Sequence, residues 1–365
     1  MTKPCVALLG WRDSPTDALE EYCRYLGAAL REQDIALEIA RVAWAEKGWR
    51  AALRELRSNA AKNPDAWFLL QYTALAWSRR GFPGRALDVV RLLKSSGVRV
   101  ATVFHDVQPY SGRGMLNRLR RRVQLHTLRS AARLSDLSIL TIPGERIPWV
   151  GRAPARSVYI PVGANLPAPE RAWTRRKGQG HTIPTAGVFC ITGGQHAISE
   201  AKLLADIVSL VAERLGTMRL VVLGRNSEAA ESVLREKLRG KAVELVVYGL
   251  LSGEDVVNAL ATCDAMLFLR GPISSRRGSG IAGIACGLPV IAQEGWETAA
   301  PITDAGVVLV PAGATHEFGP ALLRVLEDQN YRAELAERSR RAQQQHFSWQ
   351  AIAARYGEAL RNPTS

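Results

Sequence analysis

Several features that proteins commonly use are scarce in this chain of 365 residues. Its five cysteines are scattered and odd in number, and no pair has the spacing of metal ligands, which argues against a disulfide framework and a zinc motif. No apolar run approaches the roughly 20 residues that a membrane-spanning helix needs. The first residues include Asp13, Asp17 and Glu20. We therefore expect no secretory signal and a cytoplasmic protein.

Negative charge is also in short supply. The sequence has 48 Lys and Arg against 34 Asp and Glu, a formal net charge of +14 at pH 7. Such a field attracts anions, whether nucleotides, nucleic acid or an acidic membrane surface. No zinc finger, aromatic RNA-binding strand pair or other nucleic-acid module is present, so no nucleic-acid partner is expected.

The apolar content of 47% is sufficient for full hydrophobic cores, and the length suggests two domains. In the first half, short apolar segments alternate with segments of helical periodicity. This β-α-β-α order predicts a parallel, doubly wound sheet. Strands are predicted at 6–9, 35–42, 67–70, 98–104, 137–141 and 157–160, with helices at 18–31 and 86–93.

The alternation stops and then begins again. Residues 161–185 are rich in Pro and Gly and carry a charged run at 175–177, so they are predicted to include a linker. A second doubly wound sheet follows, with ligands expected outside the carboxyl ends of its strands and in a cleft between the domains. Its predicted strands are 187–191, 220–223, 243–248, 265–269, 290–291 and 307–310, with helices at 199–215 and 255–261.

The most informative stretch is 274–291, in which a loop of small residues with two arginines leads into a short helix of Ile and Ala. The free N–H groups and the dipole at a helix start favour an anion. Glycines allow a ligand to approach the backbone closely, and arginines can fork onto phosphate oxygens. A phosphate-bearing ligand is therefore expected here, the alternative being a solvated turn. The predicted set is Arg276, Arg277, Gly278, Ser279 and Gly280.

Several runs of the chain are similar to a known family, namely 137–141, 159–165, 248–290 and 347–353. They resemble GT-B-fold glycosyltransferases, and among these the retaining family-4 enzymes, over nearly the whole chain. The resemblance implies two Rossmann-like domains that face each other across a cleft, a nucleotide-sugar bound as co-substrate by the second domain, an acceptor presented by the first, and no metal ion or other cofactor. The absence of an Asp-x-Asp pair at a strand end agrees with the last point.

The resemblance also suggests how the chain is divided, because the family's last helix packs back on the first domain. The predicted parts are an N-terminal domain at 1–164, a linker at 165–185, a second domain at 186–345 and a C-terminal helix at 346–365.

The chain departs from the family pattern in two places. Ser274 and Ala282 stand where the family usually has two glutamates, the second of which holds the donor ribose. The loop 192–196 lacks the Arg and Lys that the family places after the first strand of its second domain. In this respect the chain resembles a subgroup of the family in which an Arg-Arg-Gly-Ser run replaces the usual loop. Arg276 and Arg277 are therefore expected to supply the missing positive charge.

Other donor-side candidates lie in loops of the second domain. Gly193 and Gly194 follow a strand and precede a helix, where they let the backbone approach the donor or simply form a turn. By resemblance, Leu250 and Leu251 lie against the nucleobase, and Arg225 could meet ribose or phosphate. Core packing of the leucines and exposure of the arginine are the alternatives.

In the first domain, His105 and Asp106 follow the strand at 98–104. The resemblance places a histidine near this strand end beside the donor sugar, where it could bind a hydroxyl or carry a proton. Asp106 could orient it or bind the acceptor; a structural histidine and a helix N-cap are the alternatives. The acceptor-side candidates, for which packing is an equally good explanation, are Trp11, Gln71 and Tyr72.

One segment of the first domain is basic. No acidic residue lies between Asp106 and Asp136, while arginines accumulate there. As a helix, the segment would carry Leu116, Leu119, Val123 and Leu134 on one stripe, opposite Arg118, Arg121, Arg122, Arg129 and Arg133. We expect the basic face to meet anionic lipid on the inner face of the membrane, the alternative being a core-packed helix with solvated arginines.

The leading hypothesis from the sequence is a metal-independent glycosyltransferase that moves a hexose from a nucleotide-sugar to a lipid-linked or polysaccharide acceptor, with retention implied by the family. The missing glutamates and the missing Arg/Lys pair motivate an alternative, a non-catalytic nucleotide- or sugar-binding protein of the same fold. Epimerisation of a sugar nucleotide or phosphorolysis on this fold is a third possibility.

Overall fold

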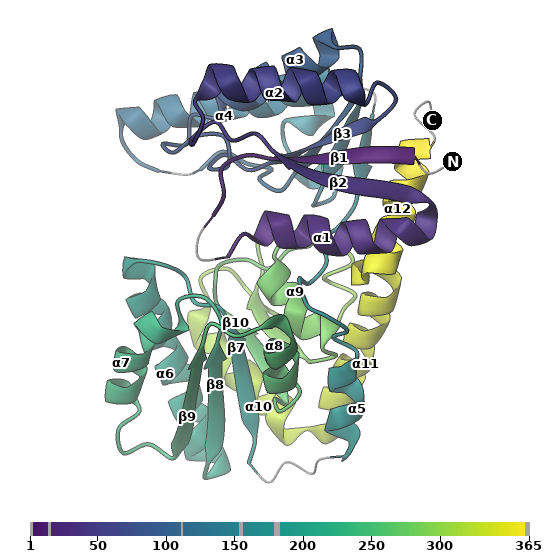
Figure 1. Ribbon diagram of the computed structural model, residues 1–365. Coiled ribbons are helices and arrows are strands. Elements are labelled where there is room, and N and C mark those ends of the chain that lie inside the picture. Colours follow the sequence, from purple (N-terminus) through teal and green to yellow (C-terminus); the bar gives the residue numbers. More distant parts are fainter. Residues whose placement is uncertain (1–2, 14–15, 111, 153–155, 179–182, 362–365) are drawn as a thin grey trace. The chain divides into compact units, whose positions relative to one another are not determined.

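The computed structural model describes residues 3–13, 16–110, 112–152, 156–178 and 183–361 (Figure 1). The chain divides into two compact units, one formed by Met1–Val162 with Trp349–Ser365 and the other by Gly163–Ser348. Each unit contains one six-stranded sheet whose described pairings are all parallel. The predicted α/β class with two doubly wound sheets is confirmed, whereas the cleft between the domains stays a prediction.

The strands of the first unit follow the order β2-β1-β3-β4-β5-β6. Its central strands are almost continuously apolar and buried, as expected for a parallel sheet with both faces covered. Helices α2, α3 and α4 cover one face, and α1 and α12 lie on the other (Figure 1). The strands are β1 (Lys3–Leu9), β2 (Ile35–Arg41), β3 (Trp67–Tyr72), β4 (Arg99–Phe104), β5 (Leu137–Leu140) and β6 (Ser157–Tyr159). The helices are α1 (Ala18–Leu30), α2 (Trp49–Lys62), α3 (Gly84–Ser95), α4 (Met115–Leu134) and α12 (Trp349–Arg361).

The last helix, α12, belongs to the first unit although the whole second unit precedes it. It packs against α1, where the buried hydroxyls of Tyr22 and Tyr356 share a hydrogen bond of 2.9 Å. The indole of Trp67 on β3 also donates to the carbonyl of Leu360 at 3.2 Å. These bonds satisfy polar atoms that would otherwise be buried without partners, and they therefore fix α12 to the first sheet.

Helix α4 differs from the sequence prediction in which face it buries. Its buried residues are Gln124, Thr127, Leu128, Ala131 and Ala132. Leu116 and Leu119 of the predicted apolar stripe, which the core-packed alternative would bury, are instead 61% and 53% exposed. The reason is that its buried contacts begin near Gln124, whose amide donates to the Gly81 carbonyl at 2.8 Å. The first half of α4 therefore presents leucines to solvent.

The second unit has the strand order β12-β11-β10-β7-β8-β9. Helix α6 packs against α7 and α10, and α9 packs against α11. The strands are β7 (Thr185–Phe189), β8 (Met218–Leu223), β9 (Val243–Gly249), β10 (Ala265–Phe268), β11 (Val290–Gln293) and β12 (Val307–Val310). The helices are α5 (Arg171–Gly178), α6 (Gln195–Leu215), α7 (Ser227–Lys237), α8 (Gly253–Leu260), α9 (Gly278–Ala285), α10 (Phe318–Glu327) and α11 (Gln329–Ala342).

Helix α5 lies in the stretch for which the sequence predicted an irregular linker. The indole of Trp173 on α5 donates to the carbonyl of Ala285 at 2.9 Å, so this helix is part of the second unit. Residues 179–182 of the predicted linker lie outside the described residues.

Candidate functional site

The centre of the second sheet is a topological switch point. Strands β7 and β10 are neighbours there, but the chain continues from β7 through β8 to β9 and from β10 through β11 to β12, in opposite directions. In open parallel sheets of this kind, ligands bind outside the carboxyl ends of the strands at such a point. The loop 190–194 after β7 and the loop 269–277 after β10 both begin at this edge.

The loop after β7 is held in place by its neighbours. The side chain of Asn226 donates to the Ile191 carbonyl at 3.0 Å, and the Thr192 N–H donates to a carboxylate oxygen of Glu200 at 2.9 Å. Gly194 is the N-cap of α6 and has φ 66°, a backbone conformation that residues with side chains rarely adopt. The predicted glycine pair therefore lies at a helix start next to the switch point, and its contact with a donor stays a prediction.

The other predicted residues on this side follow β8 and β9. Arg225 is half-buried, and its carbonyl accepts from the Ile191 N–H at 2.9 Å. Leu250 is 49% exposed, so the core-packing alternative is wrong for it, and Leu251 is half-buried. All three follow carboxyl ends of the same sheet.

Helix α9 begins beside the loop that follows β10. Arg277 is its N-cap, and its first residues are Gly278, Ser279 and Gly280. A Cβ at Gly280 would come within 3.2 Å of the Ile273 side chain, so the small residue lets this helix start lie close to the loop. The predicted phosphate-binding set thus forms one structural feature at the edge of the sheet.

Arg276 has a partner that the sequence did not indicate. Its guanidinium forks onto Glu297, with distances of 2.6 Å from Nε to Oε2 and 2.5 Å from Nη2 to Oε1. The Ser274 hydroxyl donates to the same carboxylate at 2.9 Å. Glu297 is only 6% exposed. Burial would raise the pKa of Glu297, but the hydrogen bonds from Arg276 and Ser274 and the charges of Arg276 and Arg277 lower it.

This ion pair changes what can be expected of the two arginines. Two nitrogens of Arg276 are committed to Glu297, which neutralises the charge that the sequence assigned to a phosphate group. The role of Arg276 as a ligand of the donor stays a prediction, but a function in holding loop 274–277 is now evident from its contacts. The resemblance sets Ser274 at a position where a glutamate is expected, and in this chain its hydroxyl donates to the carboxylate of Glu297.

Sequence reasoning missed a third arginine, Arg270, which lies two residues after the end of β10. Its Nη1 donates to the Ser279 hydroxyl at 3.2 Å. Burial raises the pKa of the nearby Cys190 thiol, and the positive charges of Arg270 and Arg225 partly offset this by lowering it. Arg270 therefore lies between the end of β7 and the start of α9. A basic residue immediately after a buried apolar strand was the available sequence signal.

In the first unit, the predicted residues at the ends of β3 and β4 lie side by side, because Tyr72 is in register with Phe104. Nε2 of His105 is 2.9 Å from Oε1 of Gln71. The amide of fully buried Gln71 donates to the Leu69 carbonyl at 3.3 Å, which orients its oxygen toward the histidine. The Tyr22 ring meets the imidazole edge-on at 5.0 Å. Gln71 thus favours the His105 tautomer that carries a proton on Nε2.

Asp106 holds the neighbouring loop. Its carboxylate accepts from the Ala74 N–H at 2.8 Å and from the Tyr110 hydroxyl at 3.3 Å. The N-cap alternative is wrong, because α4 begins at Met115 with Gly114 as its N-cap. Whether Asp106 also binds an acceptor stays a prediction.

The two aromatic candidates differ in exposure. Tyr72 is 1% exposed, which raises the pKa of its phenol well above the ordinary value of 10.0, and in the described part of the chain its hydroxyl has no hydrogen-bond partner. Trp11 is 37% exposed. The Arg79 guanidinium lies 4.4 Å from its ring centre, and Trp44 meets it edge-on. Trp11 can therefore offer an aromatic face to a ligand, whereas Tyr72 contributes packing.

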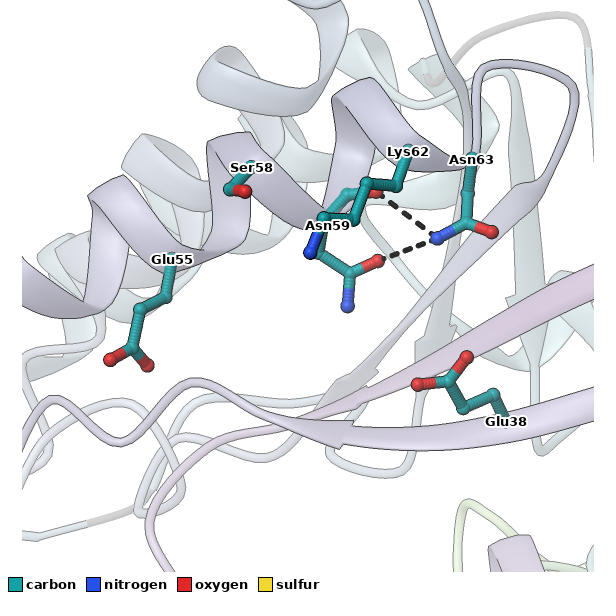
Figure 2. Close-up of a pocket in the computed structure, with 6 residues that line it drawn as sticks. All are labelled: Glu38, Glu55, Ser58, Asn59, Lys62 and Asn63. Atoms are coloured by element: carbon teal, nitrogen blue, oxygen red, sulfur yellow. Dashed lines mark hydrogen bonds between the residues drawn. The ribbon is translucent and has the colours of Figure 1, made fainter.

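Outside the sheet edges, the described residues offer one polar pocket and no metal-binding cluster. Among the described residues, no group of three His, Cys, Asp or Glu is arranged to hold a metal ion. A pocket of about 550 Å³ lies beside α2 and β2 of the first unit (Figure 2). Its lining residues are Glu38, Glu55, Ser58, Asn59, Lys62 and Asn63. None of them belongs to the predicted set, and mixed charges of this kind suit a solvated groove.

Comparison with known proteins shows which families and structures this chain is similar to. Residues 186–328 match the family model described as Glycosyl transferases group 1. A GDP-mannose-dependent monoacylated alpha-(1-6)-phosphatidylinositol monomannoside mannosyltransferase of Corynebacterium glutamicum is 26% identical over 215 residues, which are 56% of this chain. The chain spans about half the length of that curated relative, 55%.

Solved structures resemble nearly the whole chain. Sucrose-phosphate synthase from Thermosynechococcus elongatus has a TM-score of 0.68 at 17% identity, with 98% of each chain covered. HepE from Anabaena, solved with UDP and glucose, has a TM-score of 0.63 at 15% identity, covering 98% of this chain and 99% of that one. The resemblance to GT-B glycosyltransferases is confirmed by these matches, and the retaining family-4 subgroup stays a prediction.

Proposed function

We propose that this chain, whose residues 186–328 form a glycosyl transferases group 1 domain, transfers a hexose from a nucleotide-sugar to a lipid-linked or polysaccharide acceptor. The observation that carries the proposal is the convergence, at the switch point of that domain, of the Gly193–Gly194 loop, the start of α9 and arginine side chains. Helix starts and arginines suit a diphosphate, which is the leaving group of such donors.

In the proposed reaction, the bond from the sugar's anomeric carbon to the diphosphate breaks and a bond to an acceptor hydroxyl oxygen forms on the same face. The electron pair of the broken bond leaves with the diphosphate, and the hydroxyl proton passes to an oxygen of that departing diphosphate. The α9 N–H groups and the nearby arginines stabilise the negative charge on the leaving group. His105 is the proposed contact to the donor sugar, with its Nε2 proton held by Gln71. Metal independence is part of the proposal.

A donor panel tests this function. The curated relative is named for GDP-mannose and the Anabaena structure for UDP and glucose, so these two donors come first. Purified full-length chain is incubated with each donor and with lipid-linked or glycan acceptors, with and without a metal chelator, and the released nucleoside diphosphate is measured. Turnover that survives the chelator supports the proposal. Calorimetry separates the alternative, because tight nucleotide binding without product from any donor would indicate a binding protein.

We further propose that the first half of α4 docks on an anionic membrane surface. Among the described residues, no helix is both long and apolar enough to cross a bilayer. The side chains of Met115, Leu116 and Leu119 are nevertheless 85%, 61% and 53% exposed. The arginines around them that are also exposed are Arg113, Arg118, Arg121 and Arg122. Exposed leucines between cations are typical of helices that lie in the lipid interface, and each arginine near a charged surface contributes about 1 kcal/mol.

Replacing both leucines, Leu116→Ser with Leu119→Ser, should reduce binding to anionic vesicles about tenfold or more, because full burial of a leucine contributes roughly 1.5–3 kcal/mol and about half of each of these two is still exposed. Co-sedimentation with vesicles containing phosphatidylserine, at low and moderate salt, measures the effect. Ile198→Ser is the matched control, since this exposed apolar residue lies on α6 of the second unit. Equal recovery of the wild type in the supernatant with and without anionic lipid would overturn the docking proposal.

A further inference from the structure

Arg270 occupies the centre of the switch point in the second sheet. It follows β10, whose neighbour β7 runs parallel to it and ends beside the Gly193–Gly194 loop. Neither the sequence pattern nor the family resemblance assigned it a role. Its position at the carboxyl edge, between two diverging halves of the sheet, is the one at which ligands of such sheets bind.

The Arg270 side chain is held in one orientation, but not all of its hydrogen-bond donors have acceptors. Its Nη1 donates to the hydroxyl of Ser279, the second residue of α9. Its Nε is buried and has no hydrogen-bond partner in the described part of the chain. None of the ion pairs found among the described residues involves Arg270. A buried N–H donor without a partner costs free energy, and that cost disappears when an acceptor arrives.

Arg276 and Arg270 differ in the partners that their guanidinium groups have. Arg276 forks onto buried Glu297, which supplies the negative charge and the two acceptor oxygens that an arginine prefers. Arg270 has a fixed orientation and a full positive charge but only a neutral hydroxyl as its acceptor. Of these two arginines, Arg270 is therefore the one with unused capacity for a phosphate group.

We propose that Arg270, oriented by Ser279, binds the diphosphate of the nucleotide-sugar donor, while Arg276 and Glu297 hold the loop. This inference rests on the proposed function and deepens it. Ser279 accepts a hydrogen bond from Arg270, so its own hydroxyl proton is left to donate to the same phosphate. Arg270 thereby supplies at the end of β10 the positive charge that the loop 192–196 lacks.

Calorimetry on the full chain tests this assignment with GDP and UDP and with the uncharged nucleosides guanosine and uridine. Arg270→Ala should weaken nucleoside diphosphate binding about 10- to 100-fold, the range expected for a lost charged hydrogen bond, and leave nucleoside affinity unchanged. Ser279→Ala should weaken it less. Arg219→Ala is the matched control, because Arg219 also has a buried Nε without a hydrogen-bond partner but begins the same sheet's β8 strand at the opposite edge.

The outcomes separate the inference from the proposed function. If the wild type binds a nucleoside diphosphate and folded Arg270→Ala binds it equally well, the assignment of Arg270 is wrong and the function stands. If the wild type binds no nucleoside diphosphate, both the assignment of Arg270 and the proposed function are wrong. A melting curve shows whether Arg270→Ala folds. Should it not, Arg270→Lys keeps the charge but loses the fork, and wild-type affinity in that variant would equally overturn the assignment.

Discussion

Glu297→Ala should lower the free energy of unfolding of the second unit by about 3–5 kcal/mol, the usual cost of removing one partner of a buried ion pair. The substitution leaves the Arg276 guanidinium, whose side chain is 16% exposed, without the carboxylate that accepts two of its hydrogen bonds. It also removes the acceptor of the Ser274 hydroxyl. Denaturant unfolding followed by circular dichroism measures the loss.

An exposed pair in the same unit is the control for this prediction. Arg219 and Glu244 form a salt bridge of 2.8 Å with side chains 33% and 48% exposed. Surface pairs of this kind contribute about 0–1 kcal/mol, so Glu244→Ala should cost no more than that. Equal costs for Glu297→Ala and Glu244→Ala would contradict the view that burial makes the Arg276–Glu297 pair essential.

Acid should remove the contribution of Glu297. Its pKa in the folded chain lies below the ordinary value of 4.5, because the bonds and charges of Arg276 outweigh the effect of burial. A carboxyl of this kind stabilises the fold above its unfolded pKa and loses that contribution as the pH falls through the folded pKa. The wild type should therefore lose its advantage over Glu297→Gln as the pH is lowered from 7 to below 4.5, and a gap that stays constant would contradict the assignment.

The sequence predicted the sheets because their strands are short, apolar and bounded by Gly or polar residues. β10 is buried along its whole length and is apolar throughout, and β3 is likewise buried and apolar except for Gln71, as expected for central strands of a parallel sheet. Helices with small buried faces escaped prediction. α2 buries only Ala52, Leu56 and Ala60 among fourteen residues, so its apolar side is narrow and built largely from alanine, and the segment as a whole has low hydropathy.

The sequence predicted where the candidate site lies, but not which side chains within it form ion pairs and hydrogen bonds. A glycine-rich run before a helix is visible in the sequence, and α9 begins at Gly278 as the run indicated. The partner of Arg276 could not be deduced, because Glu297 lies 21 residues further on in a loop placed by the pairing of β10 with β11. Local patterns carry no information about such contacts, which depend on tertiary structure.

His105→Ala should lower the rate of sugar transfer about 100-fold or more, the usual cost of removing one positioned hydrogen-bonding group that contacts the reacting part of the substrate in the transition state. His105 follows β4 and is half-buried, with its Nε2 on Gln71 and its ring edge-on to Tyr22. These contacts orient the ring and bury few apolar atoms. The melting temperature should therefore stay within a few degrees, and a large loss of stability with normal specific activity would assign His105 to the structure instead.

A variant of Gln71 shows whether this residue acts by orienting His105 or only by packing in the core. Gln71→Leu keeps a buried side chain of similar size but removes the oxygen 2.9 Å from Nε2 of His105, so the ring loses its preferred tautomer. We expect a loss of about tenfold in transfer rate, close to the 1.4 kcal/mol of one lost hydrogen bond. Added to His105→Ala, the same change should cost nothing further, because its effect acts through the histidine. A full additional loss in the double variant would show that Gln71 supports the end of β3 independently of His105.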